Sequence, residues 1–275
     1  MPEAPEVQTV LSTLEDQIKD LKIEECRIRY EKLIDHESVP SFIQKVRGQH
    51  LRQFQRYGKY LIFVLDTYDW IVHLRMEGKF YLLPDFPEDK HIHAGFLLSD
   101  GRWLCYHDTR KFGRMQLYLK QEDFQSLPCF QKLGPDVLDP SLNADYLYQM
   151  LHHSNKCLKA CLLDQSIVAG IGNIYADEIC FACRLDPRSR SKRISKQGCV
   201  HLVYHMQRII QGAIRYGGTT IRSYTSSLGV TGRFQLKLRV HDRKDEACSV
   251  CHSIIKKIVV AQRGTYLCPK CQKRK

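Results

Sequence analysis

The stretch CSVCHSIIKKIVVAQRGTYLCPKC, residues 248–271, decides how the last part of this chain folds. It holds two Cys-x2-Cys pairs, Cys248 with Cys251 and Cys268 with Cys271, separated by sixteen residues. This spacing suits one tetrahedral zinc ion bound by four thiolates, and the segment between the pairs alternates enough to form a β-hairpin. Because four protein ligands leave no open coordination position, we predict a single structural Zn2+ and no catalytic metal.

The unit that carries this motif, residues 241–275, is too short to fold on a hydrophobic core of its own. Zinc binding should therefore supply much of its folding free energy. Arg263 lies at the tip of the expected hairpin, where a guanidinium is suited to bidentate contact with phosphate. The alternative is an ordinary exposed arginine.

The remaining cysteines do not indicate a disulfide framework. The chain has twelve cysteines in 275 residues and begins without a basic segment followed by an apolar one, so we expect reduced thiols and a cytoplasmic, nucleoid-associated protein. It also lacks a run of about 18 apolar residues, the length that a membrane helix requires. Cys180 and Cys183 have metal-like spacing, but their helical context and the lack of a second pair favour a structural role.

The charge of the chain points to a polyanionic partner. Forty-two Lys and Arg against thirty Asp and Glu give a net charge of +12 and a pI near 9.1. From residue 240 onward there are nine basic against three acidic residues, and a second basic run lies at 188–196. Nucleic acid is the first expectation, and a solvated basic surface is the alternative.

The first 120 residues read as one helix followed by strands. Residues 5–18 place apolar side chains at helical intervals, with acidic residues at the start, where the helix dipole favours them. Short β-type runs separated by turn signals follow up to about Lys120, which predicts an antiparallel sandwich or barrel. The runs are IEECRIRY, KYLIFVLD, WIVHLRM, KFYLLPD, AGFLLSD, RWLCYHD and RMQLYL.

Beyond LGPDVLDP, residues 133–140, the pattern becomes helical. Between two of the expected helices lies VAGIGN, residues 168–173, a tight glycine turn consistent with a helix-two-turn-helix, which can aim backbone N–H groups at a phosphate. We predict an α+β fold: an N-terminal antiparallel β-sandwich with a leading helix, then a helical helix-two-turn-helix domain ending in a zinc-ribbon β-hairpin. The expected domains are residues 1–133, 134–240 and 241–275.

The chain begins Met1-Pro2-Glu3-Ala4-Pro5, and an initiator Met before a small residue is normally removed. Pro2 would then expose a secondary amine. Such an amine can attack a sugar C1′ and form an iminium, which withdraws electrons and permits elimination of the neighbouring phosphate. The alternative is that Pro2 only begins a helix.

Several ordered motifs together resemble one family. They are PEAPEV at the start, RYGKYL around Lys59, HLRMEG around Met76, DTRKFGRM around Arg110, LLDQSIVAGIGNIYADEI, and VAQRGTYLCPKCQ near the end. Over essentially its whole length the chain resembles the bacterial formamidopyrimidine-DNA glycosylases, which are 8-oxoguanine glycosylases with lyase activity.

The resemblance implies catalytic roles for four residues. Pro2 would attack C1′, and Glu3 would be the acid that protonates the opening sugar or the base. Lys59 matches the lysine assigned to acid–base work in β-elimination. Arg263 matches the zinc-finger arginine that clamps phosphates around the lesion and assists δ-elimination.

The resemblance also implies how DNA is held. An enzyme that acts on a base inside a duplex must extrude it, and side chains must fill the gap. Met76, Arg110 and Phe112 match the family's void-filling trio, with Arg110 suited to the orphaned cytosine and Phe112 to wedging between bases. Further implied DNA contacts are His91, Lys159 and Asn173.

Lesion recognition is implied at Glu77, beside Met76, and in the loop YTSSLGVTGRFQ, residues 224–235, with Thr225 and Arg233 as candidate contacts. The Ser and Gly content of this loop fits a lid that orders on binding. Ala4 departs from the commoner leucine of the family, and a small residue there slightly favours the sister enzyme endonuclease VIII. The Met-Arg-Phe trio and the loop favour the purine-specific branch.

These features predict a monomeric glycosylase and abasic-site lyase of base excision repair, acting on oxidised purines in double-stranded damaged DNA. One alternative is an endonuclease VIII-like glycosylase for oxidised pyrimidines. The other is a non-catalytic zinc-ribbon DNA-binding protein.

Overall fold

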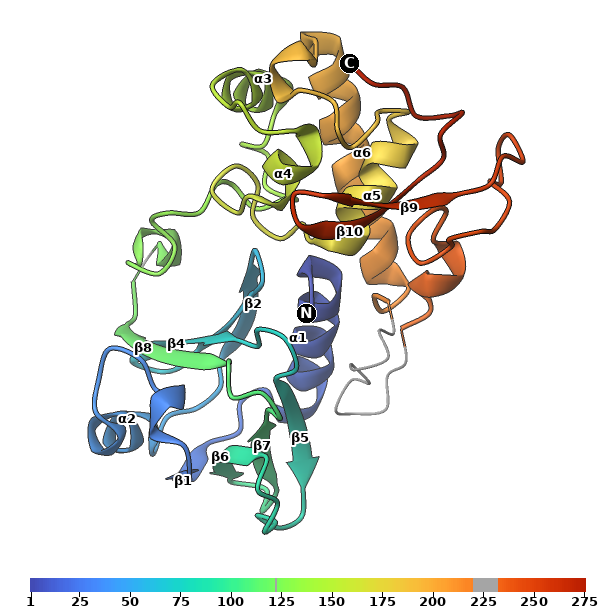
Figure 1. Cartoon of the computed structure of the whole chain (residues 1–275). Helices are drawn as coiled ribbons and strands as arrows, with labels where there is room; N and C mark the ends of the chain where they lie inside the picture. Colours follow the sequence, from blue (N-terminus) through green and yellow to red (C-terminus); the bar gives the residue numbers. More distant parts are fainter. Residues whose placement is uncertain (122, 220–231) are drawn as a thin grey trace. The chain divides into compact units, whose positions relative to one another are not determined.

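A computed structural model describes residues 1–121, 123–219 and 232–275. The chain forms two compact units (Figure 1). Unit 1 comprises residues 1–131 with 217–232, and unit 2 comprises residues 132–216 with 233–275. The division into three domains at residues 133 and 240 stays a prediction.

Unit 1 opens with helix α1 (Ala4–Ile18), as expected from its periodicity. Its apolar side chains at positions 7, 10, 11, 14 and 18 are all buried. A capping box starts the helix, in which the backbone N–H of Glu3 donates to the Glu6 carboxylate over 2.9 Å. This pairing satisfies amide donors that the first turn leaves without helical partners.

Two four-stranded antiparallel sheets pack on each other in unit 1, which confirms the predicted sandwich. One sheet has the order β1-β6-β7-β5, and its strands are β1 (Ile23–Ile28), β5 (Lys79–Leu83), β6 (Ile92–Leu98) and β7 (Trp103–His107). The other has the order β2-β3-β4-β8, and its strands are β2 (Gln53–Tyr57), β3 (Tyr60–Val64), β4 (Tyr68–His73) and β8 (Arg114–Leu119). Trp70 joins the layers, because its ring lies 4.8 Å from that of Phe63 and 4.4 Å from that of Phe96.

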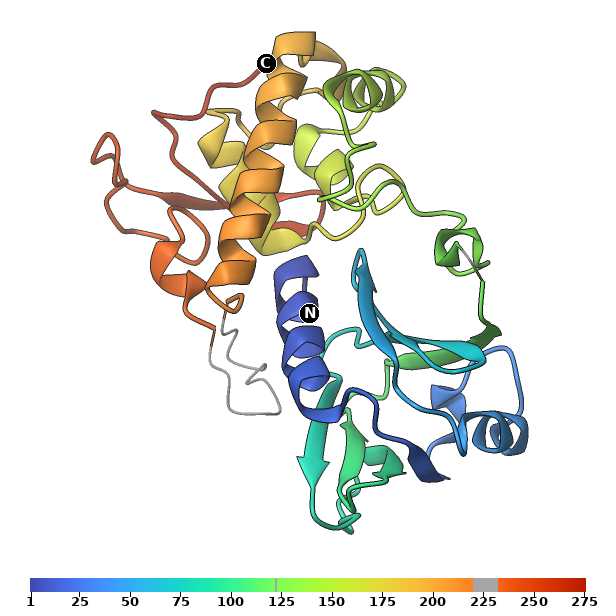
Figure 2. The ribbon, with the colours of Figure 1, turned by 180° about the vertical axis from the view of Figure 1, so that it is seen from behind.

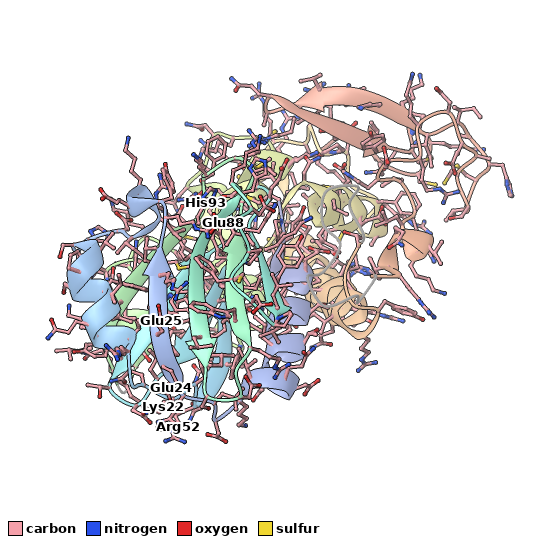
Figure 3. The ribbon with its side chains drawn as sticks, turned by 90° about the horizontal axis from the view of Figure 1, so that it is seen from below. Lys22, Glu24, Glu25, Arg52, Glu88 and His93 are labelled. Atoms are coloured by element: carbon pink, nitrogen blue, oxygen red, sulfur yellow. The ribbon has the colours of Figure 1, made fainter. Side chains whose placement is uncertain are left out.

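The two ends of the first sheet differ in character. Figure 3 shows Lys22 and Glu24 at one end and His93 at the other, in agreement with the antiparallel pairing of β1 with β6. The Lys22 ammonium pairs with the Glu24 carboxylate over 3.2 Å in a half-exposed ion pair. His93 instead is buried, and its Nε2 bonds the backbone oxygen of Asp108 over 2.7 Å. The end with His93 therefore carries the loops that build the site described below.

Two regular elements of unit 1 were not predicted, helix α2 (Val39–Val46) and strand β2. Short 3-10 turns, η1 (Glu31–Leu33) and η2 (Phe124–Ser126), complete this unit.

Unit 2 is helical, as predicted. Its elements are α3 (Ala144–His152), α4 (Leu158–Leu163), α5 (Asn173–Ala182), η3 (Ser191–Arg193), α6 (Lys196–Arg215) and η4 (Phe234–Lys237). The long helix α6, orange in Figure 2, buries Leu202, Met206 and Ile210 along one stripe and packs against α3 and α5. Residues 164–172, which include most of the turn at 168–173, join α4 to α5, and the helix-two-turn-helix is confirmed.

The C-terminal hairpin pairs β9 (Lys256–Val260) with β10 (Arg263–Leu267). Ala261 and Gln262 make the two-residue turn, and both have positive φ, 49° and 60°. Two positive φ angles are the signature of a type I′ turn, whose twist matches that of the strands. Arg263 therefore opens β10 directly after the tip, opposite Val260.

No helix among the described residues is long and apolar enough to cross a membrane.

Candidate functional site

The four predicted zinc ligands converge at the base of the hairpin. The Sγ atoms of Cys248, Cys251, Cys268 and Cys271 all lie within 4.8 Å of one another, with Cys248–Cys271 at 3.9 Å and Cys251–Cys268 at 3.4 Å. Zn–S bonds of about 2.3 Å in a tetrahedron put sulfurs about 3.8 Å apart, so the cluster fits zinc. Four converging thiolates leave no open position, and the zinc is structural.

Cys180 and Cys183 belong to no such cluster in the part of the chain that is described. Burial raises the pKa of the Cys183 thiol to about 12, and Cys180 is fully buried. Both behave as small apolar residues of α5 and its C-terminus, in agreement with the structural interpretation.

A network of buried polar side chains holds the residues that directly follow Arg263. The Lys159 ammonium has no exposed surface and bonds Asp177 over 2.7 Å, the Thr265 hydroxyl over 2.7 Å and the Gly264 oxygen over 3.2 Å. The other oxygen of Asp177 bonds His241 Nδ1 over 2.8 Å. The residues that follow Arg263 are thereby tied to α4 and α5, while Arg263 itself is exposed.

This geometry revises the assignment of Lys159 as a direct DNA contact. A lysine has three N–H donors, and all three are used inside unit 2. Lys159 instead positions the strand that carries Arg263.

Asn173 opens α5, with Gly172 as the residue before the helix. Its side-chain amide donates to the Gly264 oxygen over 3.0 Å. Asn173 and Arg263 thus lie on adjoining parts of unit 2, with the positive end of the α5 dipole beside them. This is the arrangement expected of an anion-binding surface.

The amino terminus is the chemical centre of unit 1. Pro2 and Glu3 are buried behind Met1, which is 37% exposed. Burial lowers the pKa of the terminal ammonium, Lys59 lowers it further, and the charges of Glu3, Glu6 and Glu77 oppose the shift. The charges of Lys59 and of the three carboxylates therefore all influence the pKa of the Met1 amine.

A tight turn between β2 and β3 places Lys59 near the amino terminus. Gly58 and Lys59 connect β2 to β3, with Tyr57 paired to Tyr60, and Gly58 has a φ of 57°. Positive φ at the first position of a two-residue turn favours glycine, which has no Cβ to clash there. Lys59 is only 6% exposed, an unusual burial for a lysine that puts its ammonium under the influence of the site.

A groove of about 380 Å³ opens beside Met1. It is lined by Met1, Arg75, Met76, Phe112 and Arg114. Two of the predicted void-filling residues, Met76 and Phe112, thus flank the amino terminus. The third, Arg110, stacks its guanidinium over the Phe112 ring at 4.7 Å, and Phe112 is 47% exposed.

Asp108 was not singled out in the sequence, yet it builds the loop that presents this trio. Its fully buried carboxylate accepts hydrogen bonds from the backbone N–H groups of Arg110, Phe112 and Gly113, each over 2.9 Å. The sequence Asp-Thr-Arg-Lys-Phe-Gly, residues 108–113, could have predicted this role of Asp108. An Asp followed by polar residues and Gly is typical of a turn that the Asp side chain caps.

Two glycines bring the Met76 and Phe112 loops together around Tyr106. A Cβ added to Gly78 would lie 2.2 Å from the Tyr106 hydroxyl oxygen, and one added to Gly113 would lie 1.7 Å from it. A side chain at either position would force Tyr106, or at Gly78 also the Leu74 backbone oxygen, to move. The Thr109 hydroxyl also donates to the Glu77 carboxylate, which links the two loops directly.

His91 lies at the edge of the same assembly. Its backbone oxygen accepts from the Asp108 N–H over 2.9 Å, and its ring lies 5.6 Å from that of His107. Unit 1 therefore brings together the predicted residues Pro2, Glu3, Lys59, Met76, Glu77, His91, Arg110 and Phe112. Arg233 is exposed in unit 2, and Thr225 lies outside the described residues.

Comparison with known proteins accounts for this combination. Residues 1–115 match the formamidopyrimidine-DNA glycosylase N-terminal domain, residues 133–225 match the H2TH domain of the same enzymes, and residues 245–274 match a zinc finger found in FPG and IleRS. The chain belongs to the formamidopyrimidine-DNA glycosylase family.

Individual relatives agree over full length. The chain is 43% identical to the formamidopyrimidine-DNA glycosylase of Oceanobacillus iheyensis and 41% identical to that of Bacillus subtilis, with all of this chain and at least 99% of each relative covered. The crystal structure of Lactococcus lactis Fpg with abasic-site DNA matches with a TM-score of 0.90 at 36% identity, covering 99% of this chain and 100% of that one.

Family membership fixes the class of reaction. The protein is a DNA glycosylase of base excision repair, and abasic-site lyase activity is part of the formamidopyrimidine-DNA glycosylase family. The alternative of a non-catalytic zinc-ribbon protein is thereby excluded.

Proposed function

We propose that this member of the family excises oxidised purines from duplex DNA and cleaves the resulting abasic strand, with Pro2 as nucleophile. The observation that carries the proposal is the position of the amino terminus. Loss of Met1 would open the Pro2 nitrogen to the groove lined by Met76 and Phe112, next to buried Glu3 and Lys59.

The first step joins protein and sugar. The Pro2 nitrogen attacks C1′, the N-glycosidic bond breaks, and the base leaves with the bonding electron pair. Glu3 donates a proton to the opening sugar or to the base. The attached nitrogen then loses its own proton, and its lone pair expels O4′ from C1′, so that the sugar ring opens to a C4′ hydroxyl and the C1′ iminium forms. Burial lowers the pKa of the Met1 amine that now ends the chain, and a Pro2 amine exposed at the same buried place would likewise be favoured in its unprotonated form.

Strand cleavage follows from the iminium. The iminium makes the C2′ hydrogen more acidic, and Lys59 assists the removal of this proton. The 3′-phosphate then leaves in β-elimination. Loss of the 5′-phosphate in δ-elimination comes next, with Arg263 holding that phosphate as a bidentate partner. Water finally hydrolyses the iminium and releases Pro2.

Base extrusion is assigned to the loop that Asp108 organises. Removing a base from the stack costs roughly a few kcal/mol, which inserted side chains must offset. Phe112 would wedge between bases, Met76 would fill the vacated space, and Arg110 would hydrogen-bond the unpaired cytosine. The backbone bonds to Asp108 support this role because they hold the loop ready before DNA arrives.

The remaining contacts complete the proposed interface. His91, Asn173 and Arg263 contact backbone phosphates, and Glu77, Thr225 and Arg233 face the lesion. Three structural regions, residues 1–133, 134–240 and 241–275, serve as the catalytic, helix-two-turn-helix and zinc-finger domains. The protein acts as a monomer in the bacterial cytoplasm, on the nucleoid.

Substrate choice tests this proposal against endonuclease VIII-like specificity. Single-turnover excision is measured on matched duplexes that carry 8-oxoguanine opposite cytosine or thymine glycol opposite adenine. Faster release of 8-oxoguanine supports the purine assignment, and faster release of thymine glycol contradicts it. A Phe112→Ala variant should lose excision from both duplexes, whereas the exposed Leu119→Ala should not.

A further inference from the structure

Unit 2 contains a pocket outside the features described above. It has a volume of about 530 Å³ and lies among α5, α6 and η4. Its lining residues are Glu178, Ala182, His205, Arg208, Ile209, Gly212, Tyr216, Phe234, Lys237 and Arg239. None of them is a zinc ligand or belongs to the buried network around Lys159.

One wall of the pocket is apolar and rigid. Phe234 is buried and packs against Tyr175, with ring centroids 5.9 Å apart, and against Tyr216, at 6.3 Å. Ile209 and Ala182 continue this wall. An aromatic surface fixed from behind is suited to stack a flat ring.

The rim of the pocket is cationic. Arg208, Lys237 and Arg239 are exposed, and the Lys237 ammonium lies 5.5 Å from the centre of the Tyr216 ring. The one carboxylate in the lining is Glu178, which is 5% exposed. Its oxygens accept from the backbone N–H groups of residues 239, 240 and 241, each over 2.9 Å. Both Glu178 oxygens are therefore engaged by backbone donors rather than by the side-chain cations of the rim.

Gly212 keeps the pocket open. It lies inside α6, where glycine costs about 1 kcal/mol relative to alanine. Packing does not require it, because an added Cβ would meet only a Phe234 ring carbon at 3.9 Å, an ordinary contact. The missing side chain instead leaves room at the pocket wall.

We propose that this pocket binds a nucleotide through its terminal phosphate monoester, with the base against Phe234 and Tyr216. Arg208, Lys237 and Arg239 supply the donors for the phosphate, and guanidinium groups match its geometry in bidentate fashion. A volume of about 530 Å³ falls within the range of small-ligand sites. The nucleotide is either free or the phosphorylated end of a DNA strand.

Calorimetry on the zinc-loaded full chain tests this inference with three probes. They are deoxyadenosine 5′-monophosphate, a 5′-phosphorylated single strand, and the same strand with a 5′-hydroxyl. Saturable binding of the monophosphate identifies a free nucleotide as ligand. A preference for the phosphorylated strand over the hydroxyl strand, without monophosphate binding, identifies a strand end. Absence of both effects overturns the proposal.

Variants locate the site. Gly212→Leu fills the pocket and should abolish the phosphate-dependent binding, while Gly212→Ala keeps it and verifies that α6 tolerates a side chain. Arg208→Gln and Lys237→Gln should each weaken binding about tenfold, the loss of one charge-assisted hydrogen bond. Arg193→Gln, an exposed cation on η3, is the matched control. Phosphate-dependent binding that survives Gly212→Leu in a folded protein contradicts the assignment, as does an equal loss in Arg193→Gln.

Discussion

Glu6 on α1 holds Thr219, 213 positions further along the chain. One Glu6 oxygen accepts from the Thr219 backbone N–H over 2.8 Å and from its hydroxyl over 3.0 Å, and the other accepts from the Glu3 N–H over 2.9 Å. The start of α1 and Thr219, which lies a few residues before the predicted loop 224–235, are therefore fastened to one buried carboxylate.

Replacing this carboxylate by an amide should break one of the two attachments. In Glu6→Gln the side-chain NH2 faces an N–H donor on one side, so one set of hydrogen bonds is lost. We expect the free energy of unfolding to fall by about 1–3 kcal/mol and Schiff-base formation to slow. Urea unfolding and single-turnover kinetics measure the two effects, with Asp16→Asn, exposed on the same helix, as control. Equal values in both variants would refute this role.

His73 makes unit 1 sensitive to acid. Burial, reinforced by the charges of Arg75 and Lys59, lowers the pKa of His73 from 6.5 to about 3. Its Nδ1 accepts from the Arg75 backbone N–H over 2.9 Å, which requires the neutral ring. The unfolded chain thus binds more protons between pH 6.5 and 3, and stability falls as the pH is lowered through this range.

The matching variant is His73→Asn, whose side-chain oxygen can replace Nδ1 as acceptor. The wild type should lose on the order of 4 kcal/mol between pH 6.5 and 3 through this residue. The Asn variant should lack that part of the loss. Denaturant unfolding at several pH values compares the two slopes, and identical slopes would assign the acid sensitivity to other groups.

Local spacing explains what the sequence could predict. The cysteine pairs and the apolar stripe of α1 depend on residues a few positions apart, so their geometry follows from turn and helix periodicity. The elements that were not predicted depart from such patterns. Helix α2 contains Pro40, a breaker signal that is tolerated in a first turn. Strand β2 buries Phe54 and Tyr57 without strict alternation.

The residues that support the site were not predicted for a different reason. Glu6 and Thr219 meet only through tertiary folding, as do Lys159 and Thr265, 106 positions apart. Nothing local marks Lys159 as buried, and its expected DNA contact came only from the family resemblance. Its partners in the fold, and not its neighbours in the chain, determine its role.

Breaking the Lys159 network should destabilise unit 2 and weaken DNA binding as a consequence. Lys159→Met leaves Asp177 buried without its cation, which costs roughly 3–5 kcal/mol. The exposed Lys156→Met removes an ion pair with Asp164 that contributes about 0–1 kcal/mol. Thermal unfolding compares the two variants. A direct phosphate role would instead lower DNA affinity in Lys159→Met at unchanged stability.

Zinc removal should unfold the terminal hairpin and leave unit 1 intact. Both tryptophans, Trp70 and Trp103, lie in unit 1, so their emission reports on the sandwich alone. After chelation we expect unchanged tryptophan emission, loss of duplex binding and recovery of binding on adding Zn2+. Wild-type affinity after verified zinc loss would contradict the structural role of the metal.

The most direct test of the account is borohydride reduction on an 8-oxoguanine duplex, followed by mass spectrometry of the crosslinked peptide. We expect one adduct, on the nitrogen of Pro2 in a peptide that has lost Met1, and none in a protein that retains Met1. A sugar remnant on the Lys59 side chain, or full trapping with Met1 in place, would contradict this expectation.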